Sequence, residues 1–406
     1  MAKRGAMLVT LGIASSSLVR WYLIWLFART EGGAAAVAEY GFVLALFTPI
    51  FVLCQMGLRT IFLSASVRWP WHTYVRLRWL GCVIGVVIVV GLTWLVPMIS
   101  WEMGLPMAAL KVTSSLSDLQ LGRVQYGNRM AKQGQILIVS AIGTAVGATV
   151  LVVLTGLGWT GVAMSAVMSL VSAVWARSNG RSVPYEHDAV DGAVSNILKG
   201  GMFAAGSQAL ASLLFQIPVL VLGIIASPVD TGVFTAAAYL LTAAALLGST
   251  MQTIIITPLR RRRDESGTQF LKSYSARLTR RAALAAVPLV ALVALVGDPV
   301  LRLVYGPEFG MDWTSLLLIG VGAASIVVAY IQDVTLQVLN RYGSVTAAVA
   351  MACIASIAVG GLMILLGSPH VLVGAAMAAA GGMTRFAVMA VVVRRQIATV
   401  DDATQG

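Results

Sequence analysis

Long stretches without a single charged residue constrain the fold of this chain more than any other feature. No Asp, Glu, Lys or Arg occurs in residues 133–176, 200–229 or 342–384. A helix needs about 20 mostly apolar residues to cross a bilayer, so each stretch is long enough for at least one crossing. Only 11% of all residues are charged, against about a quarter in soluble globular proteins. The sequence therefore predicts an all-α polytopic membrane protein and excludes a disulfide scaffold, a disordered tail and an ordinary soluble enzyme.

Breaks at charges, prolines and glycines divide the chain into twelve predicted membrane spans. The spans over 104–122 and 313–338 are the least apolar of them. The twelve spans cover residues 5–28, 38–64, 79–100, 104–122, 134–155, 160–176, 200–225, 231–256, 282–297, 313–338, 343–366 and 371–393.

The basic residues alternate between the two sides of these spans. With the N terminus inside, 22 of the 28 basic residues fall in cytoplasmic segments, Arg78 among them, whereas the outer loops hold only Arg29 and Arg302. Cytoplasmic loops of membrane proteins carry such an excess of Lys and Arg. The pattern therefore predicts that both termini are cytoplasmic. Most of the net charge of +12 thus serves orientation and does not indicate a nucleic-acid partner.

A long polar segment near the middle divides the chain into two halves. We expect a six-helix bundle over 1–182, a cytoplasmic linker over 183–197 and a second six-helix bundle over 198–406. The pattern Gln-x-x-Asn-Arg occurs at 125–129 and again at 337–341, after the fourth and the tenth span. Repeated halves of the same orientation are typical of transporters.

Catalytic signatures are absent from the sequence. It contains no Walker motif, no Gly-x-Ser-x-Gly and no His-Glu-x-x-His, and its loops are short. Cys54, Cys82 and Cys353 lie far apart in predicted spans, which favours small buried residues over a disulfide or a metal site. We therefore predict a transporter that recognises its substrate among its helices, without enzyme activity, metal or cofactor.

Four cations fall inside the predicted spans: Arg20, Arg59, Lys111 and Arg385. Each costs about 2.5–3.5 kcal/mol at mid-bilayer on insertion scales, so each must face water, a partner or a ligand. We assign all four to a substrate-binding cavity. For Arg20 the alternative is a structural arginine held by its own helix. For Arg59 and Arg385 it is an extended side chain that reaches the inner headgroups.

Polar residues at helical spacing extend the predicted cavity. Lys111 and Asp118 share one face of the span 104–122, but about 10.5 Å separates them along the axis, too far for a direct bond. Water in a cavity therefore explains this face better than a sealed Lys–Asp pair. Gln208 and Gln216 add a milder polar face. Asp333 could pair with Arg385 or Arg59, and both Asp118 and Asp333 are candidate proton or sodium sites.

Three short motifs carry a resemblance to a known family. They are Glu39-Tyr40-Gly41-Phe42, the run Thr231-Gly232-Val233-Phe234-Thr235-Ala236-Ala237, and the outer-loop Tyr305-Gly306-Pro307-Glu308-Phe309. In order and spacing the chain resembles the Wzx-type polysaccharide or O-antigen flippases of the multidrug/oligosaccharidyl-lipid/polysaccharide (MOP) exporter superfamily, over essentially its whole length.

That resemblance implies a MATE-like fold, with two six-helix bundles in a V around a central cavity. It also implies a function in the bacterial inner membrane. The chain would move an undecaprenyl-pyrophosphate-linked oligosaccharide from the inner to the outer leaflet by alternating access. Its partners would be the polyprenyl-pyrophosphate-linked glycan, membrane lipid, a polysaccharide polymerase and other assembly proteins.

The sign of the charges within the spans helps to choose among functions. Four cations against Asp118 and Asp333 suit an anionic substrate such as a pyrophosphate, which arginine can bind with two parallel hydrogen bonds. A cation-coupled multidrug exporter of the MATE branch is the first alternative, although a cationic drug would favour acidic residues. A non-transporting scaffold for glycan assembly is the second.

Overall fold

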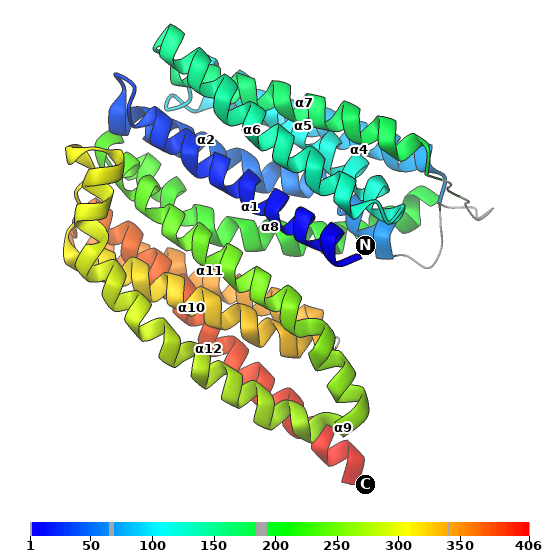
Figure 1. Ribbon diagram of the computed structural model, residues 1–406. Coiled ribbons are helices and arrows are strands. Elements are labelled where there is room, and N and C mark those ends of the chain that lie inside the picture. The colour runs from blue at the N-terminus through cyan, green and yellow to red at the C-terminus, as the bar shows by residue number, and fades with distance from the viewer. Residues whose placement is uncertain (1, 65–68, 184, 186–192, 340, 406) are drawn as a thin grey trace. The chain divides into compact units, whose positions relative to one another are not determined.

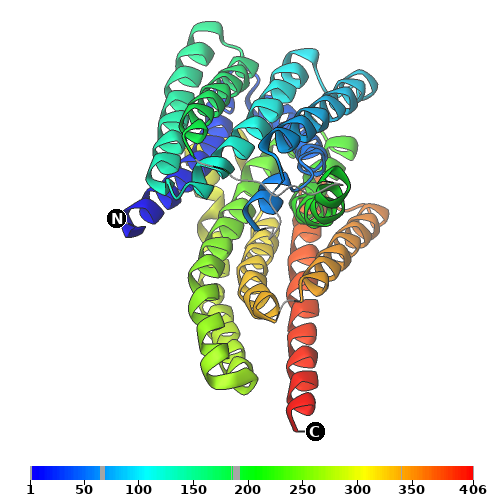
Figure 2. The ribbon, with the colours of Figure 1, turned by 90° about the vertical axis from the view of Figure 1, so that its right-hand side faces the viewer.

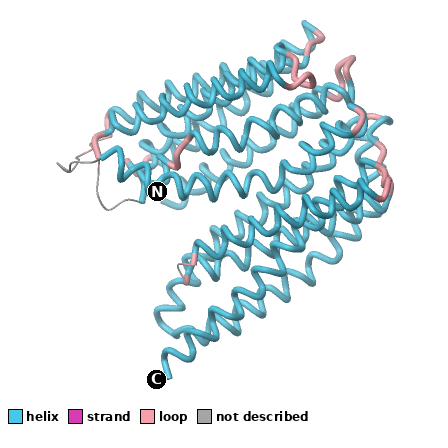
Figure 3. Tube along the Cα trace, turned by 180° about the vertical axis from the view of Figure 1, so that it is seen from behind, coloured by secondary structure: helices cyan, strands magenta, loops and turns pink. Residues whose placement is uncertain are grey.

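The computed structural model describes residues 2–64, 69–183, 185, 193–339 and 341–405. Within these residues every regular element is a helix, and short loops join the helices (Figures 1 and 3). The α-helices are α1 (Ala2–Phe27), α2 (Gly33–Cys54), α3 (Leu58–Ser64), α4 (Trp71–Leu95), α5 (Trp101–Tyr126), α6 (Met130–Thr155), α7 (Gly158–Arg181), α8 (Ala193–Ile225), α9 (Pro228–Tyr305), α10 (Trp313–Val338), α11 (Tyr342–Leu365) and α12 (His370–Gln405), with a 3-10 turn η1 (Pro307–Phe309).

Eleven segments among the described residues are long and apolar enough to cross a membrane. This confirms the prediction of an all-α polytopic membrane protein. The predicted span that is missing from the eleven is 104–122, which forms α5 together with its flanking residues. α5 has the length of its neighbours, but it carries Lys111, Asp118 and three serines, so it is too polar to be recognised as a membrane span from composition alone.

α5 packs closely on α7 through serine pairs. The Oγ atoms of Ser117 and Ser172 lie 2.9 Å apart, and those of Ser114 and Ser169 lie 3.1 Å apart. Small hydroxyl-bearing residues let helices approach closely and bond across the contact. Part of the polar surface of α5 is therefore used for packing.

The predicted spans 231–256 and 282–297 are confirmed as two separate apolar segments, but the loop expected between them was wrong. Both lie in α9, a continuous helix of 78 residues, which Figures 1 and 2 show turning back on itself between its two apolar parts, 228–252 and 274–305. The basic segment between them was expected to be a loop because it is charged. Arg, Lys, Leu and Gln are good helix formers, however, so the helix continues through it.

The predicted span 38–64 is broken in the structure. α2 ends at Cys54 and α3 begins at Leu58, because Met56 and Gly57 have φ angles of +54° and +57°. This left-handed conformation interrupts a right-handed helix. The break separates the short helix α3 from α2, and Arg59 lies at the start of α3.

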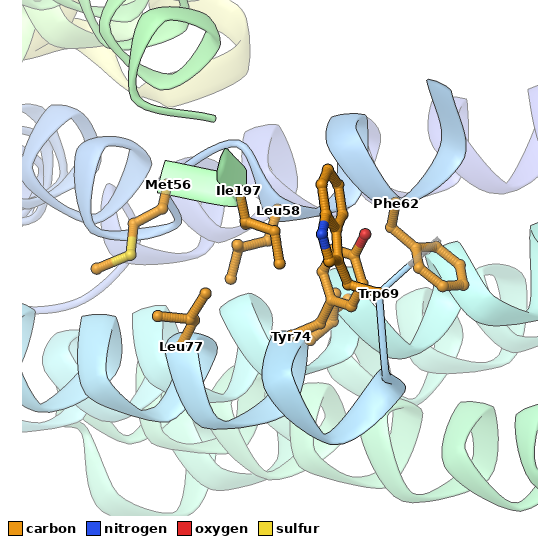
Figure 4. Packing of buried hydrophobic residues seen from close by; sticks show 8 residues of the cluster. Met56, Leu58, Phe62, Trp69, Tyr74, Leu77 and Ile197 are labelled. Atoms are coloured by element: carbon orange, nitrogen blue, oxygen red, sulfur yellow. The ribbon is translucent and has the colours of Figure 1, made fainter. Parts of the chain in front are cut away.

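A hydrophobic cluster holds α3 in place. It joins residues from the break, α3, the segment before α4, α4, α5 and the first half of α8, and Figure 4 shows this packing from close by. Its buried members are Met56, Leu58, Phe62, Trp69, Tyr74, Leu77, Leu119 and Ile197. The backbone approaches closely here too, since a Cβ on Gly81 would strike the carbonyl oxygen of Cys54 and one on Gly201 would strike that of Met56. These contacts fix the position of the backbone at Arg59.

α4 begins at Trp71, eight residues before the start of the predicted span 79–100. Arg78 therefore does not belong to a cytoplasmic loop, as its charge suggested, but lies within the helix with 1% of its surface exposed. The prediction placed the helix start after the last charge. The helix continues through Arg78 because this arginine is buried and has hydrogen-bond partners. A charged residue therefore did not mark the start of the helix at this position.

The chain divides into two compact units, residues 1–209 and 210–406, and the division falls within α8. The predicted linker over 183–197 lies partly outside the described residues, at 184 and 186–192, and the predicted domain boundaries stay a prediction. The contact of Gly201 with Met56 shows why the first half of α8 belongs to the first unit.

Candidate functional site

Two arginines and one aspartate meet in the first unit, and we call Arg59, Arg78 and Asp118 the Arg–Asp–Arg cluster. Arg59 Nη1 donates to Asp118 Oδ1 over 2.6 Å, and Arg78 Nη2 donates to Asp118 Oδ2 over 3.4 Å. One carboxylate thus bridges two guanidinium groups from α3 and α4. The cluster keeps one unbalanced positive charge.

Neutral side chains of α5 complete the cluster. Arg59 Nη2 donates to Gln125 Oε1 over 2.9 Å, and Arg78 Nη1 donates to Ser115 Oγ over 3.0 Å. Ser115, Asp118 and Gln125 recur at three and seven residues, which places them on one face of the helix. The predicted polar face of α5 therefore exists, and two arginines from other helices lie against it.

The solvent exposure of the side chains differs sharply within the cluster. The side chain of Arg78 is 1% exposed, whereas those of Arg59 and Asp118 are 29% and 30% exposed. Arg78 Nε is buried without a hydrogen-bond partner among the described residues. The cluster therefore has a sealed side at Arg78 and an open side at Arg59.

A glycine on α5 makes room for the arginine of α3. A Cβ on Gly122 would lie 3.1 Å from Cγ of Arg59, so the aliphatic part of Arg59 rests directly on the backbone of α5. Close packing leaves the guanidinium few positions. The arginine is thus held in place before any ligand arrives.

Lys111 and Arg20 are held by neutral oxygens. Lys111 Nζ donates to Thr48 Oγ1 of α2 over 2.7 Å. Arg20 is exposed on α1, where its Nη2 donates to Ser17 Oγ over 3.3 Å. The structure confirms that Lys111 does not bond to Asp118. Arg20 bonds to a serine of its own helix, one turn earlier. The role of Arg20 in binding stays a prediction.

Arg385 and Asp333 form a buried pair in the second unit. Arg385 Nη2 donates to Asp333 Oδ2 over 2.6 Å, and the two side chains are 4% and 3% exposed. The Arg385 guanidinium also lies 4.6 Å from the ring centre of Tyr330. Of the two partners expected for Asp333, the structure selects Arg385. Arg385 does not extend toward the headgroups, because it is enclosed among α10 and α12.

The remaining predicted site residues lie on α8. Gln208 is exposed in the first unit, and Gln216 is half-buried in the second. The cysteines are free, with Cys82 and Cys353 buried and Cys54 half-buried. No three His, Cys, Asp or Glu residues among those described lie close enough together to hold a metal ion.

Sequence reasoning missed Arg78, although a signal was present. The buried residues Tyr74, Gly81 and Gly85 lie on the helix face that contains Arg78. Continuing the helical spacing of Gly81 and Gly85 toward the N terminus would have placed Arg78 on the packed face of the helix. Its partner on α5, by contrast, could not be read from the sequence.

A sequence profile of the family described as "Polysaccharide biosynthesis protein" matches residues 36–314, which is more than half of the chain. The chain belongs to this family. The profile covers the cluster and all of α9, and it ends at the start of α10. Comparison with curated protein sequences gives no match.

Solved structures of low sequence identity share the fold. An inward-facing multidrug resistance MATE family transporter of the MOP superfamily is 13% identical, with a TM-score of 0.63 and 99% of each chain covered. The lipid II flippase MurJ in an inward closed conformation is 13% identical, with a TM-score of 0.64, 96% of this chain and 87% of that chain covered.

The Vibrio cholerae MATE transporter VcmN in its bent form is 10% identical, with a TM-score of 0.61, 98% of this chain and 97% of that chain covered. The chain therefore has the fold of the MOP superfamily, as its motifs predicted. The named proteins of this fold are transporters and a flippase.

Proposed function

We propose that this chain is a flippase for lipid-linked oligosaccharide. It moves an undecaprenyl-pyrophosphate-linked saccharide from the inner to the outer leaflet of the bacterial plasma membrane, for export of a surface polysaccharide. The family match supports a role in polysaccharide biosynthesis, and the similarity in fold to a lipid II flippase supports a lipid-linked substrate.

The charge of the first unit is the observation that carries this proposal. Among the described residues, Arg59 and Arg78 share one carboxylate, Asp118, whereas Arg20 and Lys111 are held by neutral oxygens. In a low-dielectric setting an unbalanced positive charge attracts an anion strongly. Arginine binds phosphate oxygens with directed hydrogen bonds, so a diphosphate group fits this unit.

The second unit contributes no such excess at its buried polar site. Arg385 is neutralised by Asp333 within the protein interior. We therefore assign recognition of the diphosphate to the first unit and give Arg385 a lesser part than the sequence suggested. Gln208 and Gln216 stay in the proposed cavity as candidate partners for sugar hydroxyls.

The proposed transport cycle follows alternating access, with both termini in the cytoplasm. The diphosphate head enters from the cytoplasmic side and the polyprenyl chain remains in lipid. The sequence has no ATP-binding motif, so the energy comes from an ion gradient or from consumption of the product outside. Asp118 and Asp333 are the proposed proton or sodium sites, and a polymerase and other assembly proteins are the proposed partners.

Cation-coupled export of small molecules is the second candidate function. The similarity in fold to MATE transporters favours it. A drug-efflux assay separates the two, because a MATE-type exporter lowers drug accumulation in the cell while leaving the surface polysaccharide unchanged.

Deletion of the gene tests the flippase proposal. We expect surface polysaccharide to disappear and lipid-linked oligosaccharide to accumulate on the cytoplasmic leaflet. The plasmid-borne wild-type chain should restore export. Normal polysaccharide without accumulation of the lipid-linked precursor would contradict the proposal.

A further inference from the structure

Asp118 lies between two arginines in the first unit. Its two oxygens accept hydrogen bonds from two different arginines, Oδ1 from Arg59 and Oδ2 from Arg78. A phosphate between two arginines is bound in the same manner, oxygen by oxygen. The carboxylate thus satisfies part of the donor set that would otherwise be open to a ligand.

The carboxylate neutralises the two arginines only in part. Two guanidinium groups face a single negative charge, and Arg78 Nε is buried without a partner among the described residues. Buried charges are stable when they are paired and fully hydrogen-bonded. A ligand with more than one negative charge would satisfy this arrangement better than Asp118 does.

The geometry allows exchange on one side of the cluster. Arg59 and Asp118 are each about one-third exposed, whereas Arg78 is enclosed. The 3.4 Å contact of Asp118 with Arg78 is longer than its 2.6 Å contact with Arg59. Since charge-assisted bonds of this kind are typically about 2.7–2.9 Å, the longer contact is the weaker of the two.

We infer that Asp118 is an internal competitor that a diphosphate group displaces from the two arginines. This inference rests on the proposed function and gives Asp118 a different part in it from ion coupling. Arg59 and Arg78 are the recognising residues, and Ser115 and Gln125 position them. Weak anions with a single charge do not displace the carboxylate, so the cluster selects for the diphosphate of a membrane-bound carrier.

Binding to the purified full-length chain in lipid nanodiscs tests this inference. The probes are inorganic pyrophosphate and farnesyl diphosphate, measured by calorimetry on wild type and Asp118→Asn. Removal of the competitor should tighten binding of both probes at least about tenfold, or about 1.4 kcal/mol. Binding by Asp118→Asn within twofold of wild type would overturn the inference.

A matched variant separates competition from a change in net charge. Asp298→Asn also removes a carboxylate from an ion pair with arginine, because Asp298 pairs with Arg302 at 2.9 Å in the second unit. It should leave both affinities unchanged. An equal gain in Asp298→Asn would overturn the inference, as would a gain that persists in the double variant Asp118→Asn/Arg59→Gln.

The two probes distinguish the source of the diphosphate. We expect wild type to bind farnesyl diphosphate at least about tenfold more tightly than pyrophosphate, because the prenyl chain is removed from water on binding. Equal affinities would overturn the lipid carrier as the ligand and indicate a free diphosphate.

A measurement on the wild-type chain keeps the inference testable if Asp118→Asn does not fold. Pyrophosphate should protect Arg59 from an arginine-specific dicarbonyl reagent, as read by mass spectrometry, while exposed Arg177 stays reactive. Unchanged modification of Arg59 at saturating pyrophosphate would overturn the inference. A normal surface polysaccharide after gene deletion would instead contradict the proposed function and leave the binding result intact.

Discussion

Two carboxylates of this chain pair with arginine, but their surroundings give them different roles. Asp333 is 3% exposed and lies in a closed pair with Arg385, whereas Asp118 is 30% exposed and is shared by two arginines. Desolvation makes a closed buried pair costly to separate. A partly exposed carboxylate can be replaced by another anion at much lower cost. The pair of Asp333 with Arg385 is therefore closed, whereas Asp118 is the carboxylate that we propose is available for exchange.

Breaking the buried pair should destabilise the protein strongly. Arg385→Met leaves Asp333 buried without its partner, which we expect to cost about 3–5 kcal/mol of folding free energy. Thermal unfolding in detergent measures the loss. The double variant Arg385→Met/Asp333→Leu should recover most of the stability, since it leaves no charge unpaired. A double variant no more stable than Arg385→Met would contradict a structural pair.

Replacement of Arg59 should impair export without loss of the folded protein. Arg59→Gln removes the charge-assisted hydrogen bonds to the substrate, worth about 1.5–3 kcal/mol each. Arg59→Lys keeps the charge but cannot form two parallel bonds, so it should restore export only in part. Surface polysaccharide measures both effects. Arg177→Gln, at an exposed position of α7, is the control with full export, and normal export in Arg59→Gln would contradict the assignment.

At the scale of single residues, the sequence singled out Arg20, Arg59, Lys111 and Asp118, because charges within apolar segments need partners. The structure gives each of them a partner, and their role in binding stays a prediction. Arg78 was missed because it directly precedes an apolar run, where a charge looks like a helix boundary. The pairing of Asp118 with two arginines depends on contacts across 40 and 59 positions of the sequence, which hydropathy does not contain.

At the scale of elements, hydropathy predicted both ends of one helix, α10, which also carries a capping signal. α10 covers the predicted range 313–338, because Asp312 caps its first turn through Ser315. The break between α2 and α3 was not predicted. It depends on Met56 in a left-handed conformation that packing against Gly81 and Gly201 stabilises. Such tertiary contacts override local propensity.

The close contact between α8 and the α2–α3 break gives a test at this scale. A Cβ on Gly201 would collide with the backbone carbonyl of Met56. Gly201→Ala should therefore destabilise the first unit by about 1–3 kcal/mol through overpacking. It should also lower export, because Arg59 follows the displaced segment.

Gly206 on the same helix provides the matched control. A Cβ there would meet nothing within 4 Å, so Gly206→Ala should be neutral or stabilise the helix by about 0.5–1 kcal/mol. Thermal unfolding of the two variants measures the difference. Equal stability of the two would contradict the described packing of α8 on the break.

At the scale of the whole molecule, α5 decides the number of membrane crossings. It is the long polar helix outside the eleven apolar segments, yet both termini share one side only if α5 also crosses. We expect Glu102→Cys to react with an impermeant maleimide from outside. Asn128→Cys should react only after permeabilisation. The native cysteines are first replaced by alanine. Labelling of both positions from one side would contradict the predicted topology.

The most direct test of the account is transbilayer movement of the substrate by the purified chain in liposomes. An undecaprenyl-diphosphate-linked oligosaccharide is placed in both leaflets, and a lectin or glycosidase added outside reads how much becomes accessible. Wild type should expose nearly all of it, whereas Arg59→Gln should expose no more than protein-free liposomes do. Movement at the protein-free rate with wild type, or equal movement with Arg59→Gln, would contradict the account.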